Sequence, residues 1–255
     1  LKIRKINIFA ESFDYFDEKN ILFFSAGFSL ETVDSTTNVN RAILFIDKSE
    51  IKASKNVKTN YNRKQSTSDS DQINHLLKTK TTINSKELLI DFKNNEKSVV
   101  TYIKNVAVKQ PDKTMLANRL KLNLIENVFE ASENVSFTFN NIGWLLNKKR
   151  TIKNPDIKKM LTLKTSISAN YGKFNAENNT VTLKKSIKLK QQNFKLTCEN
   201  LVYDIDNELL IFSGNVIVKK FGIEHFNSKK LIIDIKNETF RTKSSQNLSE
   251  IMIEL

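Results

Sequence analysis

Few side chains in this sequence are of the types that do chemistry, and their spacing does not bring them together. There is one cysteine, Cys198, and the two histidines, His75 and His225, lie far apart in the chain. A structural zinc site needs several Cys or His ligands at short spacings, and a disulfide framework needs paired cysteines. No glycine-rich phosphate loop is present. We therefore expect no metal site, no disulfide and no cofactor.

Four aspartates recur where apolar stretches end: Asp47, Asp91, Asp204 and Asp234. A pair of carboxylates can act as general acid and general base. Recurrence at the ends of similar stretches favours turn chemistry instead, because Asp and Asn side chains bond their own backbone in turns. With no other catalytic constellation in the sequence, we predict that the protein is not an enzyme.

The elements that must position these residues have the two-residue period of half-buried β-strands. Apolar and polar residues alternate over 120–124, 135–139 and 187–190. Val, Ile, Phe and Thr are abundant, as strands prefer, and no long stretch has a helical apolar period. With only five Gly and two Pro, the turns must come from Asn, which tolerates left-handed backbone. The sequence predicts an all-β protein.

A repeat of about thirty residues organises these strands. Seven copies follow the pattern small-x-x-apolar-x-apolar-Asp/Asn, and they begin at Ala10, Arg41, Ser85, Ala117, Ala169, Cys198 and Ser228. The pattern is weaker in the second copy, where Arg41 replaces the small residue, and in the fifth, where Gly172 replaces the apolar one. A second limb follows and begins with an Asn-apolar pair such as Asn56-Val57 or Asn215-Val216, or with Gly27-Phe28 or Ser186-Ile187 in its place. One copy cannot bury its own apolar face, so stacked copies must share a core. Cys198 stands at the small position, so we predict an inward and unreactive thiol.

The clearest copy, residues 196–204 followed by 209–218, resembles the OstA/LptA-like repeat of lipopolysaccharide transport proteins, and residues 212–216 (FSGNV) are its most specific part. LptA, the soluble part of LptC and the amino-terminal part of LptD share this domain. The resemblance implies a single elongated, open β-jellyroll of stacked antiparallel strands over residues 1–255, built from about seven repeats. It implies that lipid acyl chains lie in the apolar interior. It also implies edge-to-edge joining with LptC-like and LptD-like domains, or with a second copy, in the periplasm.

Inward apolar residues would line the lipid groove under this resemblance. The predicted groove residues are Leu88, Ile90, Val106, Val108, Leu120, Leu122, Val135, Phe137, Leu201, Tyr203, Val216, Val218, Leu231 and Ile233. In such a fold the core and the groove are the same surface, so the sequence does not separate the two roles.

Two inserts interrupt the repeats. Residues 60–81 are polar and predict a loop, whereas residues 140–165 carry Trp144 and several lysines and predict an exposed excursion with an aromatic and basic tip. The net charge of +13 is concentrated here, since residues 141–195 hold thirteen Lys and Arg against two acidic residues. The predicted basic patch, suited to anionic lipid headgroups or an acidic partner, is Lys148, Lys149, Arg150, Lys153, Lys158, Lys159, Lys184, Lys185, Lys188 and Lys190.

These features favour a non-enzymatic periplasmic bridge that carries lipopolysaccharide or a related glycolipid between the inner and outer membranes. The alternatives are a β-solenoid adaptor that binds only protein edges and a basic nucleic-acid-binding protein. We expect no nucleic acid, because no aromatic stacking motif stands on an exposed strand face and Phe occupies predicted buried positions. No run of about 18 apolar residues exists. The chain begins at Leu1 without a signal peptide, so we expect it to be a processed or trimmed product.

Overall fold

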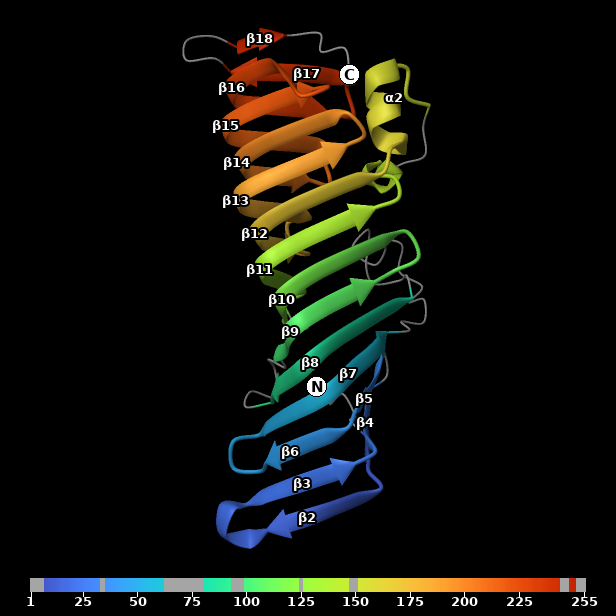
Figure 1. Ribbon diagram of the computed structural model, residues 1–255, viewed down its shortest axis with the longest axis vertical. Coiled ribbons are helices and arrows are strands. Elements are labelled where there is room, and N and C mark those ends of the chain that lie inside the picture. The colour runs from blue at the N-terminus through green and yellow to red at the C-terminus, as the bar shows by residue number, and fades with distance from the viewer. Residues whose placement is uncertain are drawn as a thin grey trace. The chain divides into compact units, whose positions relative to one another are not determined.

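The structure is a computed structural model that describes residues 7–32, 35–61, 80–92, 99–123, 126–146, 151–243 and 248–250. Its strands pair antiparallel with their neighbours (Figure 1), which confirms the predicted all-β jellyroll of repeated strands. The chain divides into two compact units, unit 1 (Leu1–Pro111 and Leu116–Ala131) and unit 2 (Asp112–Met115 and Ser132–Leu255). A single domain over residues 1–255 stays a prediction. None of the described helices is long and apolar enough to cross a membrane.

Unit 1 contains short strands at its start and full-length strands after them. They are β1 (Asn7–Phe9), β2 (Ser12–Phe16), η1 (Asp17–Lys19), β3 (Ile21–Ala26), β4 (Phe28–Glu31), β5 (Ser35–Val39), β6 (Arg41–Phe45), β7 (Glu50–Tyr61), β8 (Thr81–Asp91), β9 (Val99–Lys109) and most of β10 (Lys113–Asn123). Two rows of short strands, β2–β3–β6 and β1–β4–β5, both end on β7, which pairs with β6 through its first half and with β5 through its second. A single strand therefore runs through both halves of the fold.

Unit 2 repeats this plan with full-length strands. They are the end of β11 (Val128–Phe139), then β12 (Thr165–Asn175), β13 (Thr180–Gln191), β14 (Phe194–Asp204), β15 (Leu209–Lys220), β16 (Ile223–Asp234), β17 (Thr239–Lys243) and β18 (Leu248–Glu250), with η2 (Gly143–Leu145) and α2 (Pro155–Thr162) between β11 and β12. From β12 to β18 each strand pairs antiparallel with the next. Adjacent strands in the sequence are thus neighbours in the sheet.

A crease at the middle of each long strand folds the sheet over. In β7, β9, β11 and β13 two successive residues have positive φ at this point, as Lys55 (64°) and Asn56 (57°) do in β7, and Gly214 and Asn215 do the same in β15. The pairing register shifts at the same places, for example between Ser54 and Val57. Two left-handed residues in one strand form a bulge that bends it sharply. The Asn-apolar pairs that mark the repeat are therefore creases within strands, not the starts of new ones.

The crease divides unit 2 into two arms. The first arm contains residues 171–175, 180–184, 200–204, 209–213 and 230–234, and its strands are joined by the Asn-rich turns. The second arm contains residues 166–168, 187–191, 194–197, 216–220 and 223–228, and its strands are joined by short turns such as Gln192-Asn193. The turns of the two arms are the two lips of the fold, opposite the crease.

The turns of the first arm have the chemistry that the sequence predicted. Asp204 Oδ1 accepts from Asn207 N at 3.1 Å, and Asp234 Oδ1 accepts from Asn237 N at 2.8 Å. These bonds confirm the predicted turn role of both aspartates, and Asp47 accepts from the side chain of Asn20 in a neighbouring turn. Successive turns are also linked through the backbone, by bonds from Ile46 N to Asn20 O, Phe92 N to Ser49 O, Ile205 N to Asn179 O and Ile235 N to Glu208 O.

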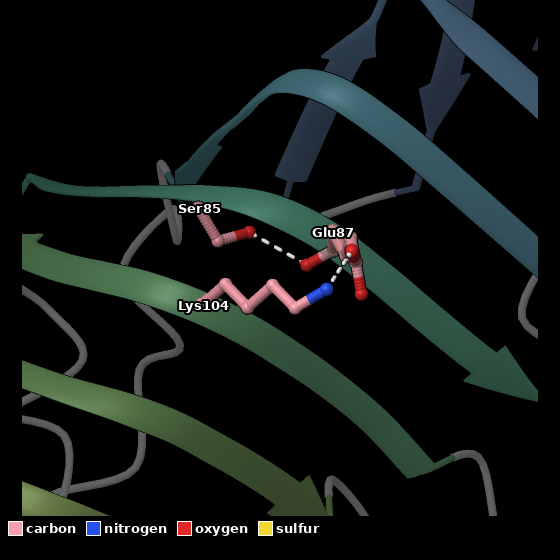
Figure 2. Close-up of polar contacts among 3 residues, drawn as sticks. All are labelled: Ser85, Glu87 and Lys104. Atoms are coloured by element: carbon pink, nitrogen blue, oxygen red, sulfur yellow. Dashed lines mark hydrogen bonds and ion pairs between the residues drawn. The ribbon is translucent and has the colours of Figure 1, made fainter.

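Small residues lie at the crease because the arms come close together there. Ser85, Cys198 and Ser228 each donate to the carbonyl oxygen two residues later, at 2.8 Å, 3.3 Å and 3.0 Å. Figure 2 shows this bond for Ser85, beside an ion pair in which Lys104 Nζ lies 2.7 Å from Glu87 Oε1. Burial raises the pKa of the Cys198 thiol to about 12. The predicted inward position of Cys198 is confirmed, and the raised pKa disfavours the reactive thiolate.

Replacing Cys198 tests the crease. We expect Cys198→Ser to change the free energy of unfolding by less than about 1 kcal/mol, because serine makes the equivalent bond in two other repeats. Cys198→Leu should destabilise the fold by about 1–3 kcal/mol through overpacking. Urea unfolding followed by circular dichroism measures both, and equal losses for the two variants would contradict this role of the crease.

Candidate functional site

The interior of unit 2 is an apolar space between the two arms. Leu201, Leu231 and Ile233 of the first arm and Val216 and Val218 of the second are at most 4% exposed. They belong to one continuous cluster that also contains Leu183, Ile187, Leu189, Leu196, Cys198, Tyr203, Leu210, Phe212, Ile235 and Phe240. Burial on this scale is the dominant favourable term in folding, and it gives the interior the character of a hydrocarbon medium.

The predicted groove residues lie on strands of both units. All are buried except Val108 and Phe137, which are half-buried. Those in unit 2 lie in the cluster above or pack against it, as Phe137 does, apart from Val135, which is also fully buried. Those in unit 1 lie on β8, β9 and β10. Whether these residues contact a lipid stays a prediction.

Unit 1 differs because its interior includes a chain of hydroxyl groups. Tyr102 is 1% exposed, and its hydroxyl donates to Thr59 Oγ1 at 2.9 Å and lies 3.2 Å from the hydroxyl of Tyr61. Thr59 in turn bonds Thr37 at 2.9 Å. Burial raises the pKa of Tyr102 well above its usual value. The groups satisfy one another, so the chain links β5, β7 and β9 across the interior.

The described part of the insert between β11 and β12 packs against unit 2 and is not the exposed excursion that its charge suggested, whereas the predicted aromatic and basic tip lies outside the described residues. We call residues 141–146 and 151–164 the strap. Its buried side chains are Ile142, Leu145, Ile152, Ile157, Met160 and Leu161, and all of them join the unit 2 cluster. Figure 1 shows its helix α2 beside the strands of unit 2. The apolar residues at helical spacing in 157–161 carried the signal for this packing, and the surrounding lysines masked it.

One cavity between the arms of unit 2 is small. Its volume is about 30 Å³, and it is lined by Ile142 and Met160 of the strap and by residues of both arms, including Leu196, Phe212 and Leu231. A space of this size holds one or two water molecules. An acyl chain therefore enters this cavity only if side chains move.

The predicted basic patch lies partly on the strap and partly on β13. Lys153, Lys158 and Lys159 are exposed on the strap, and Lys184, Lys185, Lys188 and Lys190 are exposed on β13. Lys190 stands directly opposite Lys195 of β14, which stands opposite Lys219 of β15. Like charges at such cross-strand positions repel each other, so this row attracts anions. Lys148, Lys149, Arg150, His75 and the side chain of Trp144 lie outside the described residues, as does most of the polar insert at 60–81.

The start of unit 1 exposes apolar side chains on an edge strand. Within the described residues β2 pairs only with β3, and β1 only with β4. Phe13, Tyr15 and Phe16 of β2 are 61%, 51% and 48% exposed, and Ile8 and Phe9 of β1 are exposed too. The expectation that Phe is buried is wrong here. We call these five residues the apolar edge, and it is of the kind that pairs with another chain.

Sequence reasoning missed about half of the interior. Each strand contributes one inward stretch to each arm, but only one of the two was selected, so Ile187, Leu196 and Phe212 were left out although they alternate in the same way. Tyr102 and Thr59 were missed because nothing in the local pattern marks a tyrosine that reaches a threonine on another strand. Among the described residues, no three His, Cys, Asp or Glu side chains gather closely enough to hold a metal ion.

The creased antiparallel strands and the apolar interior make an LptA-like open β-jellyroll. A family described as "LptA/(LptD N-terminal domain) LPS transport protein" matches residues 82–239, which is more than half of the chain. The chain therefore belongs to this family of lipopolysaccharide transport proteins.

Among solved structures, the chain is similar to LptH of Pseudomonas aeruginosa, described as the LptA homologous periplasmic component of the conserved lipopolysaccharide transport device. The identity is 12%, the match covers 68% of this chain and 95% of that one, and the TM-score is 0.36. No curated protein sequence matches the chain. The family assignment rests on the family match over residues 82–239.

The hydroxyl chain of unit 1 can be tested by removing one oxygen. We expect Tyr102→Phe to lower the free energy of unfolding by about 1–3 kcal/mol, because it leaves Thr59 without its donor in a buried place. A double-mutant cycle with Thr59→Val should show coupling of at least about 0.5 kcal/mol. Tyr15→Phe is the control, since the Tyr15 hydroxyl bonds Asp17 on the surface. Equal effects of Tyr102→Phe and Tyr15→Phe in urea unfolding would refute the role of the chain.

Proposed function

We propose that this protein is a non-enzymatic carrier that takes the acyl chains of lipopolysaccharide, or of a related glycolipid, into the apolar interior of its jellyroll. We place it in the periplasm, as part of a bridge between the inner and outer membranes. The continuous apolar interior of unit 2 carries the proposal, because it joins inward residues of both arms over successive strands. Each methylene of an acyl chain that leaves water for such an interior contributes about 0.8 kcal/mol.

The headgroup of such a lipid has an anionic, hydrated surface that must stay outside. The lysines of β13 and of the strap stand on the exposed side of the fold, where they can meet phosphate groups without being desolvated. Exposed charges act within a Debye length of about 8 Å at physiological salt, so they favour anionic amphiphiles over neutral ones. We propose this orienting role for the basic patch. In this proposal the positive charge binds the anionic headgroup of the lipid, and we propose no nucleic-acid partner.

The apolar edge supplies the joint of the proposed bridge. The side of β2 that has no partner strand among the described residues offers backbone donors and acceptors, and its aromatic side chains add area that is costly to leave in water. The partner we propose is the edge strand of another jellyroll of the same family, LptC-like, LptD-like or a second copy of this chain. A protein that used only this edge and never took up lipid would instead be the structural adaptor considered above.

Lipid uptake is tested with a lipid A analogue whose acyl chain carries a photoreactive diazirine. We expect Phe137→Arg to abolish crosslinking, because a guanidinium on the inward face of β11 makes the interior hostile to hydrocarbon. Thr138→Arg is the matched control, since its neighbouring position on the same strand points to the other face. Mass spectrometry of the crosslinked peptides measures the yield.

Crosslinking that survives Phe137→Arg unchanged would contradict transport through the interior. Protein that assembles into filaments after removal of all lipid, yet never takes up an acyl chain, would favour the adaptor.

The joint is tested by charging the edge. We expect the wild-type protein to self-associate with rising concentration, and the double variant Phe13→Lys/Phe16→Lys to stay monomeric, because edge lysines block strand pairing. Phe221→Lys is the control, since Phe221 is 69% exposed but lies in a turn. Sedimentation velocity measures the assembly. The double variant associating like wild type, or a wild type that stays monomeric, would count against this edge as a joint between copies.

A further inference from the structure

The strap crosses the open side of unit 2 and is pinned to both lips. It leaves the fold after β11 and returns at β12, and the bond from Ile142 N to Leu161 O (2.9 Å) closes its base. The side on which it lies is opposite the crease, where the two arms would otherwise be apart. A segment in this place decides whether anything can enter between the arms from the side.

On the first arm the pin is Glu238, in the turn between β16 and β17. Its Oε2 accepts from Lys153 N at 2.9 Å and from Asn154 N at 2.5 Å, and its backbone oxygen accepts from Asn154 Nδ2 at 3.3 Å. The hydroxyl of Tyr203, also on the first arm, donates to Leu145 O. Carboxylate bonds to backbone N–H groups are charge-assisted and among the stronger hydrogen bonds in proteins.

On the second arm the pin is Gln191, at the end of β13. It is 4% exposed, and its Nε2 donates to Met160 O at 2.9 Å and to Thr165 Oγ1 at 2.6 Å. Glu238 and Gln191 therefore hold the two ends of the same strap segment on opposite lips.

The strap places apolar side chains where a lipid chain would lie. Ile157 is fully buried, and Ile142 and Met160 line the remaining cavity together with residues of both arms. With the strap in place this cavity has room for one or two water molecules, not for a chain of methylenes. The strap and an acyl chain thus compete for the same space.

The strap can also detach from the two arms as a single segment. Its described residues form no strand pairing, and its helix α2 has eight residues, a length that is marginal without tertiary contacts. Its pins are hydrogen bonds rather than a β ladder, so they can break without disturbing the pairing of β12 to β17. Exposed Lys153, Lys158 and Lys164 on its outer side face the region where an anionic headgroup would stand.

From this geometry we propose that the strap is an autoinhibitory lid, which fills the acyl site of unit 2 when the protein is empty and must be displaced for lipid to enter there. The inference rests on the proposed function. The apparent affinity of unit 2 for an acyl chain is then reduced by the fraction of molecules whose lid is closed. The strap is part of unit 2, so the proposed penalty applies to the acyl site of that unit.

The test uses a palmitoyl lysophospholipid with a diazirine in its chain and maps the labelled peptides by mass spectrometry. We expect Glu238→Ala to raise labelling of unit 2 peptides by about tenfold or more, since the two charge-assisted bonds it removes exceed the roughly 1.4 kcal/mol that a tenfold change requires. Labelling of unit 1 peptides should not change, which gives an internal reference. Glu238→Gln keeps an acceptor oxygen, so it should show a smaller rise.

Hydrogen exchange on the same samples shows whether the lid has opened. Faster exchange of the 156–162 amides with unchanged protection of β14 and β15 marks an open lid on a folded unit. If β14 and β15 lose protection in Glu238→Ala, Tyr203→Phe takes its place as a milder variant.

If hydrogen exchange shows an open lid but the labelling of unit 2 equals that of the wild type, the lid proposal is wrong and the transport proposal still stands. No labelling of either unit in any variant would overturn the transport proposal itself.

Discussion

The crease is the constraint on which the rest of this structure depends. A strand of eleven or twelve residues is longer than a small sandwich needs. Two left-handed residues at the middle of β7 and of β13 bend the strand sharply, so that each strand belongs to two arms. Left-handed backbone costs a residue with a Cβ about 1–2 kcal/mol, less for Asn and nothing comparable for Gly. This conformational free-energy cost recurs in every hairpin, and the burial of apolar surface between the arms offsets it.

Two arms that face each other create an interior, and the two units fill theirs differently. Unit 1 also has buried apolar side chains, and it adds the hydroxyls of Thr37, Thr59 and Tyr102, which are buried and bond one another, with the half-buried Tyr61 beside them. Unit 2 uses apolar side chains and adds the strap between its lips. The hydroxyl bonds are directional and hold β5, β7 and β9 at fixed distances, whereas apolar packing is non-directional and tolerates exchange of one hydrocarbon for another.

Local pattern predicted the parts of the fold that local chemistry controls. The aspartates that end apolar stretches bond their turns, Cys198 lies at the crease, and the alternating stretches are strands, because each of these depends on residues close together in the sequence. The strap was missed because its burial depends on partners such as Glu238 and Gln191, which lie far from it in the chain. Its lysines suggested exposure, but an amphipathic segment keeps charges on one side while burying the other. For most strands the inward residues of only one arm were predicted, because the crease interrupts the alternation of apolar and polar residues where a strand passes from one arm to the other.

Under the proposed function, the strap gives the lipid groove a cover when no lipid is bound. An open apolar cleft would leave hydrocarbon surface in water, at about 25 cal/mol for each Å², and would invite aggregation. Ile157, Met160 and Leu161 remove that surface with the protein's own side chains. An acyl chain that replaces them buries hydrocarbon of the same kind, so the two fillings differ little in hydrophobic free energy, and the balance is decided by the pins at Glu238 and Gln191 and by the entropy of ordering the strap. A few polar contacts can thereby control access to a large apolar interior.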